Sequence, residues 1–541
     1  MMLAKPKPLF IFALVLSALM VLMPFPAFSI NESADTPEEE NKKKEDSTRG
    51  EWTTTDHSRL KPLQGDFRSG DEITAACLSC HSEAASQFHK TLHWTWIDPA
   101  SKENFPTGKA GYSLNNFCIS TNGMKDKKCS SCHTGWNGKK GAVNCLVCHG
   151  KEKFNWEETF ADLEYFSSEE DEDSREFAQE VLSSIRTAAQ NVGRPDRRNC
   201  GSCHFMGGGG DGVKHGDLDT SLINPAKALD VHMDADGENF QCTRCHTTVQ
   251  HRIAGRIYST PAVNERKSLI QDDLTAKITC ESCHTATPHE PGHKANDHTD
   301  KVACQSCHIP TFARVKPTKI WWDWSKAGKL KDGKPYTEEG PLGKEDYMSI
   351  KGEMKWAKDV KPEYFWFNGS IETLTAKDKI DPYREVKVAW PTGEAGDPDS
   401  RIFPFKVHRG TTPYDIQNKT ILTPLLSGEN GFWTTFDWQR SFKLGADYLD
   451  LDYSGDYGFA PTSYVFPITH MVAPKENVVG CSECHVKNTG RLASLGGFYM
   501  PGRDREDVVN FFGWAVVIGS VLGVGLHGFG RFLSRKNGKS S

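Results

Sequence analysis

One five-residue signature, Cys-x-x-Cys-His, occurs eight times and constrains how this chain can fold. The copies begin at Cys77, Cys129, Cys145, Cys200, Cys242, Cys280, Cys304 and Cys481. If the 17 cysteines and 20 histidines of the 541 residues were placed at random, roughly 0.02 copies would be expected. Any fold of this chain therefore has to present two thiols and an imidazole together at eight places.

The fixed place of the histidine indicates which group is bound. Two thiols spaced three apart attach a c-type haem covalently, and the adjoining histidine is the proximal ligand of its iron. Zinc would pair Cys-x-x-Cys units to complete four ligands, and disulfides require no trailing histidine. The sequence therefore predicts eight covalently attached haems c, and it leaves open whether calcium binds as well.

The motifs name the residues that hold these haems. The cysteines expected to bind haem are Cys77, Cys80, Cys129, Cys132, Cys145, Cys148, Cys200, Cys203, Cys242, Cys245, Cys280, Cys283, Cys304, Cys307, Cys481 and Cys484. The expected proximal iron ligands are His81, His133, His149, His204, His246, His284, His308 and His485.

The close spacing of the motifs limits which fold classes this chain can adopt. Seven of them fall between Cys77 and His308, about one per 33 residues, which leaves room for short helices and loops around porphyrins. We expect a mainly α multihaem cytochrome c fold with a large irregular content and a haem-packed core. A longer helix is expected over 167–191, where apolar residues recur at helical spacing. Residues 310–470 are rich in tryptophan and are expected to be irregular, partly stranded structure.

The two ends of the chain indicate export and a membrane anchor. Residues 1–29 have the basic start, apolar run and small-residue cleavage site of a secretory signal, with a retained anchor as the alternative. The apolar stretch 508–529 is long enough to span a membrane as a helix. Arg531, Arg535 and Lys536 follow it and place the C-terminus in the cytoplasm. The haem-bearing body is therefore expected on the periplasmic face of the inner membrane.

Distal iron ligands have to come from outside the motifs, where 12 histidines remain. The seven expected to serve are His93, His232, His251, His289, His298, His408 and His470. Each of them taken alone could instead be a surface or propionate-binding histidine. Seven leave one iron without a histidine partner, and an iron with a weak or open sixth position is where a substrate binds.

Three segments are distinctive beyond the haem motifs: GGGGDGVKHGDLD after CGSCH, DVHMDADGENFQCTRCH before HRIAGR, and NDHTDKVACQSCHIP. They resemble the octahaem tetrathionate reductases, which are relatives of the octahaem hydroxylamine oxidoreductases and pentahaem nitrite reductases. The resemblance covers about residues 70–500. It implies that the haem at Cys129–His133 is catalytic, with Lys214 as its distal ligand and Asp211 and Cys118 beside it. Cys118 is also the one cysteine outside the motifs, and a buried inert thiol is the alternative reading.

The expected function is reduction of a small sulfur or nitrogen substrate, such as tetrathionate, nitrite or hydroxylamine. Two alternatives stay open: an electron conduit from the quinol pool without substrate turnover, and a hydroxylamine-type oxidase. The C-terminal helix is either a simple anchor or a contact with a quinol-oxidising membrane subunit. The sequence leaves the oligomeric state open, and the absence of a basic tract argues against nucleic acid as a partner.

These expectations divide the chain into six parts. They are a signal peptide (1–29), a charged flexible linker (30–69), a seven-haem core with the catalytic haem (70–309), a haem-free aromatic segment packed on that core (310–470), the eighth haem site (471–500), and a transmembrane helix with a basic tail (501–541).

Overall fold

The computed structural model describes residues 55–537, apart from 256–278 and the single positions 100, 102, 103, 116, 140 and 505. The expected signal peptide and the first part of the linker lie outside the described residues. From His57 onward the chain folds into two 3-10 turns, η2 (His57–Arg59) and η3 (Lys61–Leu63). Leu63 and Phe67 are buried in a core cluster, so the flexible linker ends earlier than the expected boundary at residue 69.

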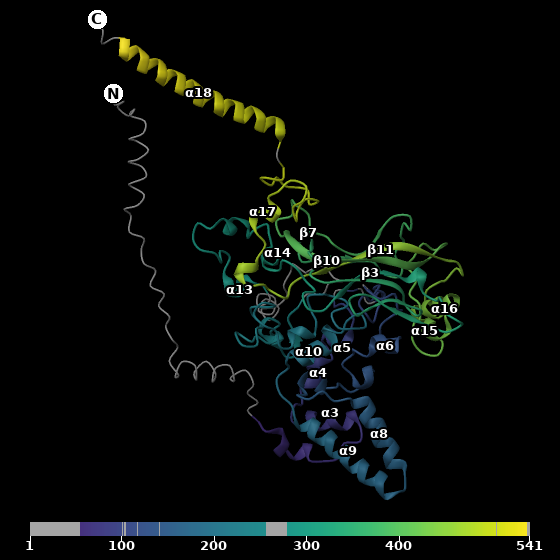
Figure 1. The fold of residues 1–541 in the computed structure, drawn as a ribbon. Helices are drawn as coiled ribbons and strands as arrows, with labels where there is room; N and C mark the ends of the chain where they lie inside the picture. Colours follow the sequence, from purple (N-terminus) through teal and green to yellow (C-terminus); the bar gives the residue numbers. More distant parts are fainter. Residues whose placement is uncertain are drawn as a thin grey trace, which may run out of the picture. The chain divides into compact units, whose positions relative to one another are not determined.

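Short helices carry the haem motifs (Figure 1). They are α3 (Gly70–Leu78), α6 (Lys127–Ser130), α7 (Leu146–His149), α10 (Arg197–His204), α11 (Cys242–Cys245), α13 (Glu281–His284), α14 (Cys304–His308) and α17 (Cys481–Cys484). One turn suffices because residues i, i+3 and i+4 share one face of a helix, which aims both thiols and the imidazole the same way. In five motifs the histidine N–H donates to the carbonyl of the first cysteine at 2.9–3.0 Å. These bonds join His81 to Cys77, His149 to Cys145, His246 to Cys242, His284 to Cys280 and His485 to Cys481.

The expected longer helix is α9 (Glu172–Gln190), and it packs against α8 (Trp156–Ser168), which the sequence analysis did not foresee. Asp171 caps α9 by accepting a hydrogen bond from the Ser174 N–H. Leu182 and Ile185 of α9 are almost completely buried, whereas Phe177 is 42% exposed. This helical pair therefore has a side-chain core of its own beside the Cys77 motif.

A nine-stranded sheet forms most of the segment without motifs. Its strands are β3 (Thr318–Asp323), β4 (Thr337–Glu339), β5 (Glu345–Met348), β6 (Gly352–Ala357), β7 (Glu363–Phe367), β8 (Ile371–Thr373), β9 (Val386–Pro391), β10 (Arg401–Asp415) and β11 (Tyr457–Pro467). Their order is β4-β5-β6-β3-β10-β11-β9-β8, and β7 also pairs with β10. The expected mainly α class is thus only partly right, because helices and a large sheet share the fold.

The register of β10 and β11 brings four large side chains to one face of this sheet. Lys406 pairs with Phe466 and His408 with Tyr464. Since side chains two apart on a strand share a face, these four side chains lie on the same side of the sheet. Three of them, Lys406, His408 and Phe466, pack with Phe117, which belongs to the segment that precedes the Cys129 motif.

The remaining described elements are short, except for one. They are α4 (Ala84–Phe88), α5 (Leu92–Thr95), α15 (Phe432–Thr435), α16 (Trp438–Leu449), the hairpin β1 (Thr248–Val249) and β2 (Arg252–Ile253), and the turns η4 (Trp136–Gly138), η5 (Thr220–Leu222), η6 (Lys294–His298), η7 (Trp324–Lys326) and η8 (Lys475–Asn477). The exception is α18 (Asp507–Asn537), whose stretch Asp507–Arg535 is long and apolar enough to cross a membrane. The expected apolar C-terminal helix is therefore present.

Candidate functional site

Six motif histidines each face a second histidine ring. The ring centroids lie 5.8–6.4 Å apart in the pairs His81–His57, His204–His93, His246–His470, His284–His232, His308–His289 and His485–His298. Two imidazoles on opposite sides of one metal ion, each bonded at about 2.0–2.1 Å, have ring centroids about 6 Å apart. The pairs therefore fit the two axial ligands of a haem iron.

His251 lies at the tip of the β1–β2 hairpin. Gln250 and His251 both have positive φ, 49° and 64°, as the two-residue turn of a tight hairpin requires. This conformation is costly for residues other than glycine, and such strain is concentrated at functional positions. Burial and the neighbouring His149 lower the pKa of His251. The hairpin thus brings His251 close to the proximal histidine of the Cys145 motif.

Backbone carbonyls fix the orientation of several proximal rings. The Nδ1 atoms of three motif histidines lie 2.7–3.0 Å from carbonyl oxygens: His149 from Gly193, His246 from Ala254 and His485 from Pro501. When Nδ1–H donates to a carbonyl, the other ring nitrogen, Nε2, is left for a metal. This arrangement is the usual support of a metal-bound imidazole.

The Cys129 motif differs from the others. The N–H of His133 donates to Ser130 O rather than to the first cysteine of the motif. Its Nε2 lies 2.8 Å from Trp94 O, and its Nδ1 accepts the Gly135 N–H at 3.2 Å. The rings that contact His133 are Trp94 and Trp96, at 4.9 and 5.3 Å between centroids. In the described part of the chain, no histidine ring faces His133.

Lys214 comes from the glycine-rich loop that follows α10. Gly208 and Gly216 in this loop have φ of +80° and +81°, and a Cβ on either would lie 2.8 Å from a phenylalanine ring. Lys406 of β10 holds the loop, because its Nζ donates to Val213 O at 3.0 Å and to Lys214 O at 2.7 Å. Lys406 was not among the residues expected to be functional. Its signal in the sequence was a lysine within the apolar run 402–407.

The amine of Lys214 is poised to lose its proton. Its Nζ lies 5.6 Å from the centroid of the Phe466 ring. Burial, followed by the positive charge of Lys109, lowers the pKa of Lys214 to about 7, while Cys132 opposes this shift. Only a neutral amine has a lone pair for a metal, and the electrostatic contact with Cys132 shows that this amine lies near the Cys129 motif.

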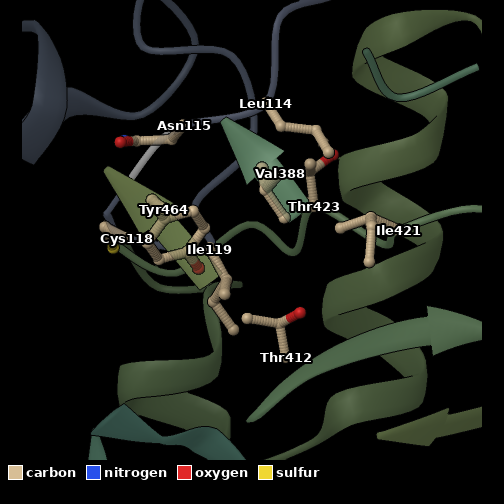
Figure 2. A pocket seen from close by; sticks show the side chains of 9 residues that line it. All are labelled: Leu114, Asn115, Cys118, Ile119, Val388, Thr412, Ile421, Thr423 and Tyr464. Carbon is tan, nitrogen blue, oxygen red and sulfur yellow. The ribbon is translucent and has the colours of Figure 1, made fainter. Parts of the chain in front are cut away.

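Cys118 lines a small cavity next to strands β9, β10 and β11. Burial, with a smaller contribution from Cys129, raises the pKa of Cys118 to about 12, so this thiol stays neutral near pH 7. The cavity has room for about one water molecule, and Cys118 and Tyr464 lie together on one side of it (Figure 2). The Thr412 hydroxyl in its wall has no hydrogen-bond partner among the described residues.

Asp211 and His408 make contacts that differ from those expected from the sequence. Asp211 accepts hydrogen bonds from the backbone N–H and the hydroxyl of Thr220, and Lys316 Nζ lies 3.7 Å away. The buried His408 ring stacks against Tyr464 at 5.4 Å and contacts Phe117, rather than facing a motif histidine. His57, which was passed over, occupies the place opposite the first motif histidine. It is one of the 12 histidines outside the motifs, which was its only signal.

Cysteines of different motifs lie beside one another, which shows which haem sites are neighbours. The thiols lie close enough to shift each other's pKa strongly in the pairs Cys77–Cys145, Cys132–Cys203, Cys200–Cys242 and Cys280–Cys304. Weaker electrostatic contacts join Cys148 to Cys200, Cys245 to Cys283 and Cys307 to Cys484. The eight motifs therefore form one unbroken series, with the Cys129 motif as a branch beside the Cys200 motif.

Comparisons with known proteins place the chain in a family. The bacterial cytochrome c family model matches residues 319–488. An uncharacterized protein of Archaeoglobus fulgidus is 24% identical over 247 residues, which are 38% of this chain and 82% of that protein. The crystal structure of an octahaem cytochrome c from Shewanella oneidensis is 38% identical, with a TM-score of 0.65, and the match covers 81% of this chain and 94% of that one. Similarity in sequence and fold over nearly the whole of that cytochrome shows that the chain belongs to the multihaem cytochromes c and carries covalently bound haem c.

Proposed function

We propose that this protein is an octahaem cytochrome c that reduces a small sulfur or nitrogen oxyanion at the haem held by Cys129 and Cys132. One observation carries the proposal: among the described residues, seven motif histidines have a histidine partner nearby, whereas His133 has none and Lys214 lies beside its motif. Seven closed sites and one site with an exchangeable ligand are what an enzyme fed by a haem chain requires.

The proposal assigns the distal ligands from the pairs. They are His57, His251, His93, His470, His232, His289 and His298 for the motifs beginning at Cys77, Cys145, Cys200, Cys242, Cys280, Cys304 and Cys481. His57 takes the place expected for His408, because His408 contacts aromatic rings on the sheet instead.

The side chains around the Cys129 motif have separate roles in this proposal. Bound haem supplies an iron with a sixth coordination position and electrons from its neighbours. Lys214 binds as a neutral amine, leaves when it takes a proton, and then offers positive charge to an oxyanion. Asp211 keeps the loop folded through Thr220, so its contacts favour a positioning role. Cys118 provides a thiol that can react with a sulfur compound.

The proposal is tested by film voltammetry of the holoprotein with tetrathionate, thiosulfate, nitrite and hydroxylamine. A reductive catalytic current with at least one of them is expected, and it should fall at least tenfold in Lys214→His, which closes the sixth position permanently. Lys227→Met, at an exposed lysine, is the matched control and should keep most of the current. An oxidative current with hydroxylamine would instead identify an oxidase, and no current with any compound would overturn the proposal.

A pure electron conduit is the second candidate. It is favoured by the unbroken series of neighbouring motifs from Cys77 to Cys481 and by the apolar helix α18 that follows the last motif. In this function α18 anchors the protein with its basic end in the cytoplasm and meets a quinol-oxidising membrane subunit. Voltammetry would then show only reversible haem signals without turnover.

A further inference from the structure

A completely buried carboxylate, Asp217, touches one of the paired histidines. Its Oδ2 lies 3.2 Å from His470 Nδ1 and accepts the backbone N–H groups of Thr469 at 2.9 Å and His470 at 3.1 Å. The Thr469 hydroxyl also lies 3.1 Å from the same Nδ1. The other oxygen, Oδ1, has no partner among the described residues. Asp217 is thus fixed by the backbone with its charge directed at His470.

This contact distinguishes His470 from the other paired histidines that the structure describes. The Nδ1 partners of His57 and His251 are neutral, the Thr55 carbonyl and the Gln87 side-chain oxygen, each at 3.1 Å. The nearest comparable carboxylate, that of Asp230, lies 3.9 Å from Nδ1 of His232, which is too far for a hydrogen bond.

A negative acceptor on the outer nitrogen makes an imidazole a stronger electron donor to its iron. Stronger donation stabilises the ferric state more than the ferrous state, so the reduction potential falls. The effect is large inside a protein because a buried charge is little screened. His470 lies opposite His246, the proximal histidine of the Cys242 motif, at 6.3 Å between ring centroids.

We propose that Asp217 lowers the reduction potential of the haem bound by Cys242 and Cys245. The inference rests on the ligand assignment made under Proposed function. This haem site adjoins the Cys200 motif on one side and the Cys280 motif on the other. Asp217 therefore raises the energy of an electron on the haem through which electrons pass between the Cys200 and Cys280 sites.

The test is a spectroelectrochemical titration of holoprotein, with electron paramagnetic resonance to follow single haems. In Asp217→Asn, which keeps an oxygen at the same place without its charge, the reduction equilibrium of one haem should shift at least tenfold toward the ferrous form. A tenfold shift corresponds to about 59 mV for one electron. The low-spin state of all haems should be unchanged, and an unmoved potential would overturn the inference.

Two further variants separate the possible failures. His470→Ala should turn one haem high-spin; if it does not, the ligand assignment fails with the inference. If it does while Asp217→Asn shifts nothing, the assignment stands and the inference alone fails.

Gln87→Glu covers the case in which Asp217→Asn does not fold. It places a carboxylate at His251 Nδ1 and should shift the Cys145 haem at least tenfold toward the ferric form. No shift in this variant would likewise contradict the inference.

Discussion

Acid should release Lys214 from the iron of the Cys129 haem. The pKa of this amine is about 7 instead of its ordinary 10.5, because it is buried and faces Lys109. With a pKa of 7, about 9% of the amines are neutral at pH 6 and about 91% at pH 8. A raised pH therefore favours the iron-bound amine, and a lowered pH favours the protonated, released form.

Covalent attachment of the haem should further lower the pH at which half of the Lys214 amine is released from the iron. The negative charge of Cys132 is the one contribution that raises the pKa of Lys214, and a thioether bond removes it. Iron also binds only the neutral amine. The midpoint of release in the holoprotein should therefore fall at or below pH 7.

The measurement is a pH titration of the oxidised holoprotein from about pH 5 to 9, with magnetic circular dichroism to count high-spin haems. One high-spin haem should appear as the pH falls. Lys214→Ala should show it at every pH, and Lys109→Met should raise the midpoint because a repelling charge is gone. Lys316→Met is the matched control and should leave the midpoint in place. A high-spin count in the wild type that is independent of pH would refute the reasoning.

Three further predictions concern residues away from Lys214. His57→Phe should turn one more haem high-spin in the same spectra, whereas His89→Phe, at a ring tilted against Trp94, should not. Cys118→Ala should reduce turnover of tetrathionate more than that of nitrite, and an equal loss for both would show that the thiol is structural. Ile185→Ala removes a side chain with no exposed surface and should lower the free energy of unfolding by about 2–5 kcal/mol. Phe177→Ala, at an exposed site, should change it by less than about 1 kcal/mol, and equal losses in thermal unfolding would contradict the packing of α9.

Local chemistry explains which parts of the site could be predicted. The thiols and the proximal histidine of each motif lie within five residues, so one helical turn fixes their geometry and the sequence displays it. Distal ligands come from anywhere in the chain: His298 faces His485 across 187 residues. No spacing rule distinguishes such a histidine from His408, because only the packing of β10 against Phe117 decides that His408 faces aromatic rings.

The sheet was only partly foreseen for a similar reason. Aromatic and alternating stretches indicated strands, but the parallel pairing of β3 with β10 joins Trp321 to Arg409 and is set by long-range contacts. Helix α9 was predictable because its cap and its apolar spacing are local signals.

Thiols from unlike motifs meet in pairs in this structure, for example Cys132 with Cys203 and Cys280 with Cys304. In an oxidising compartment such thiols cross-link if the chain folds before its cofactors are attached. A single wrong disulfide would block two attachment sites at once. In such a compartment, the biogenesis of this protein would therefore require a thiol reductant and haem attachment that is faster than folding. The regions where cysteines of two motifs lie side by side would then fold last.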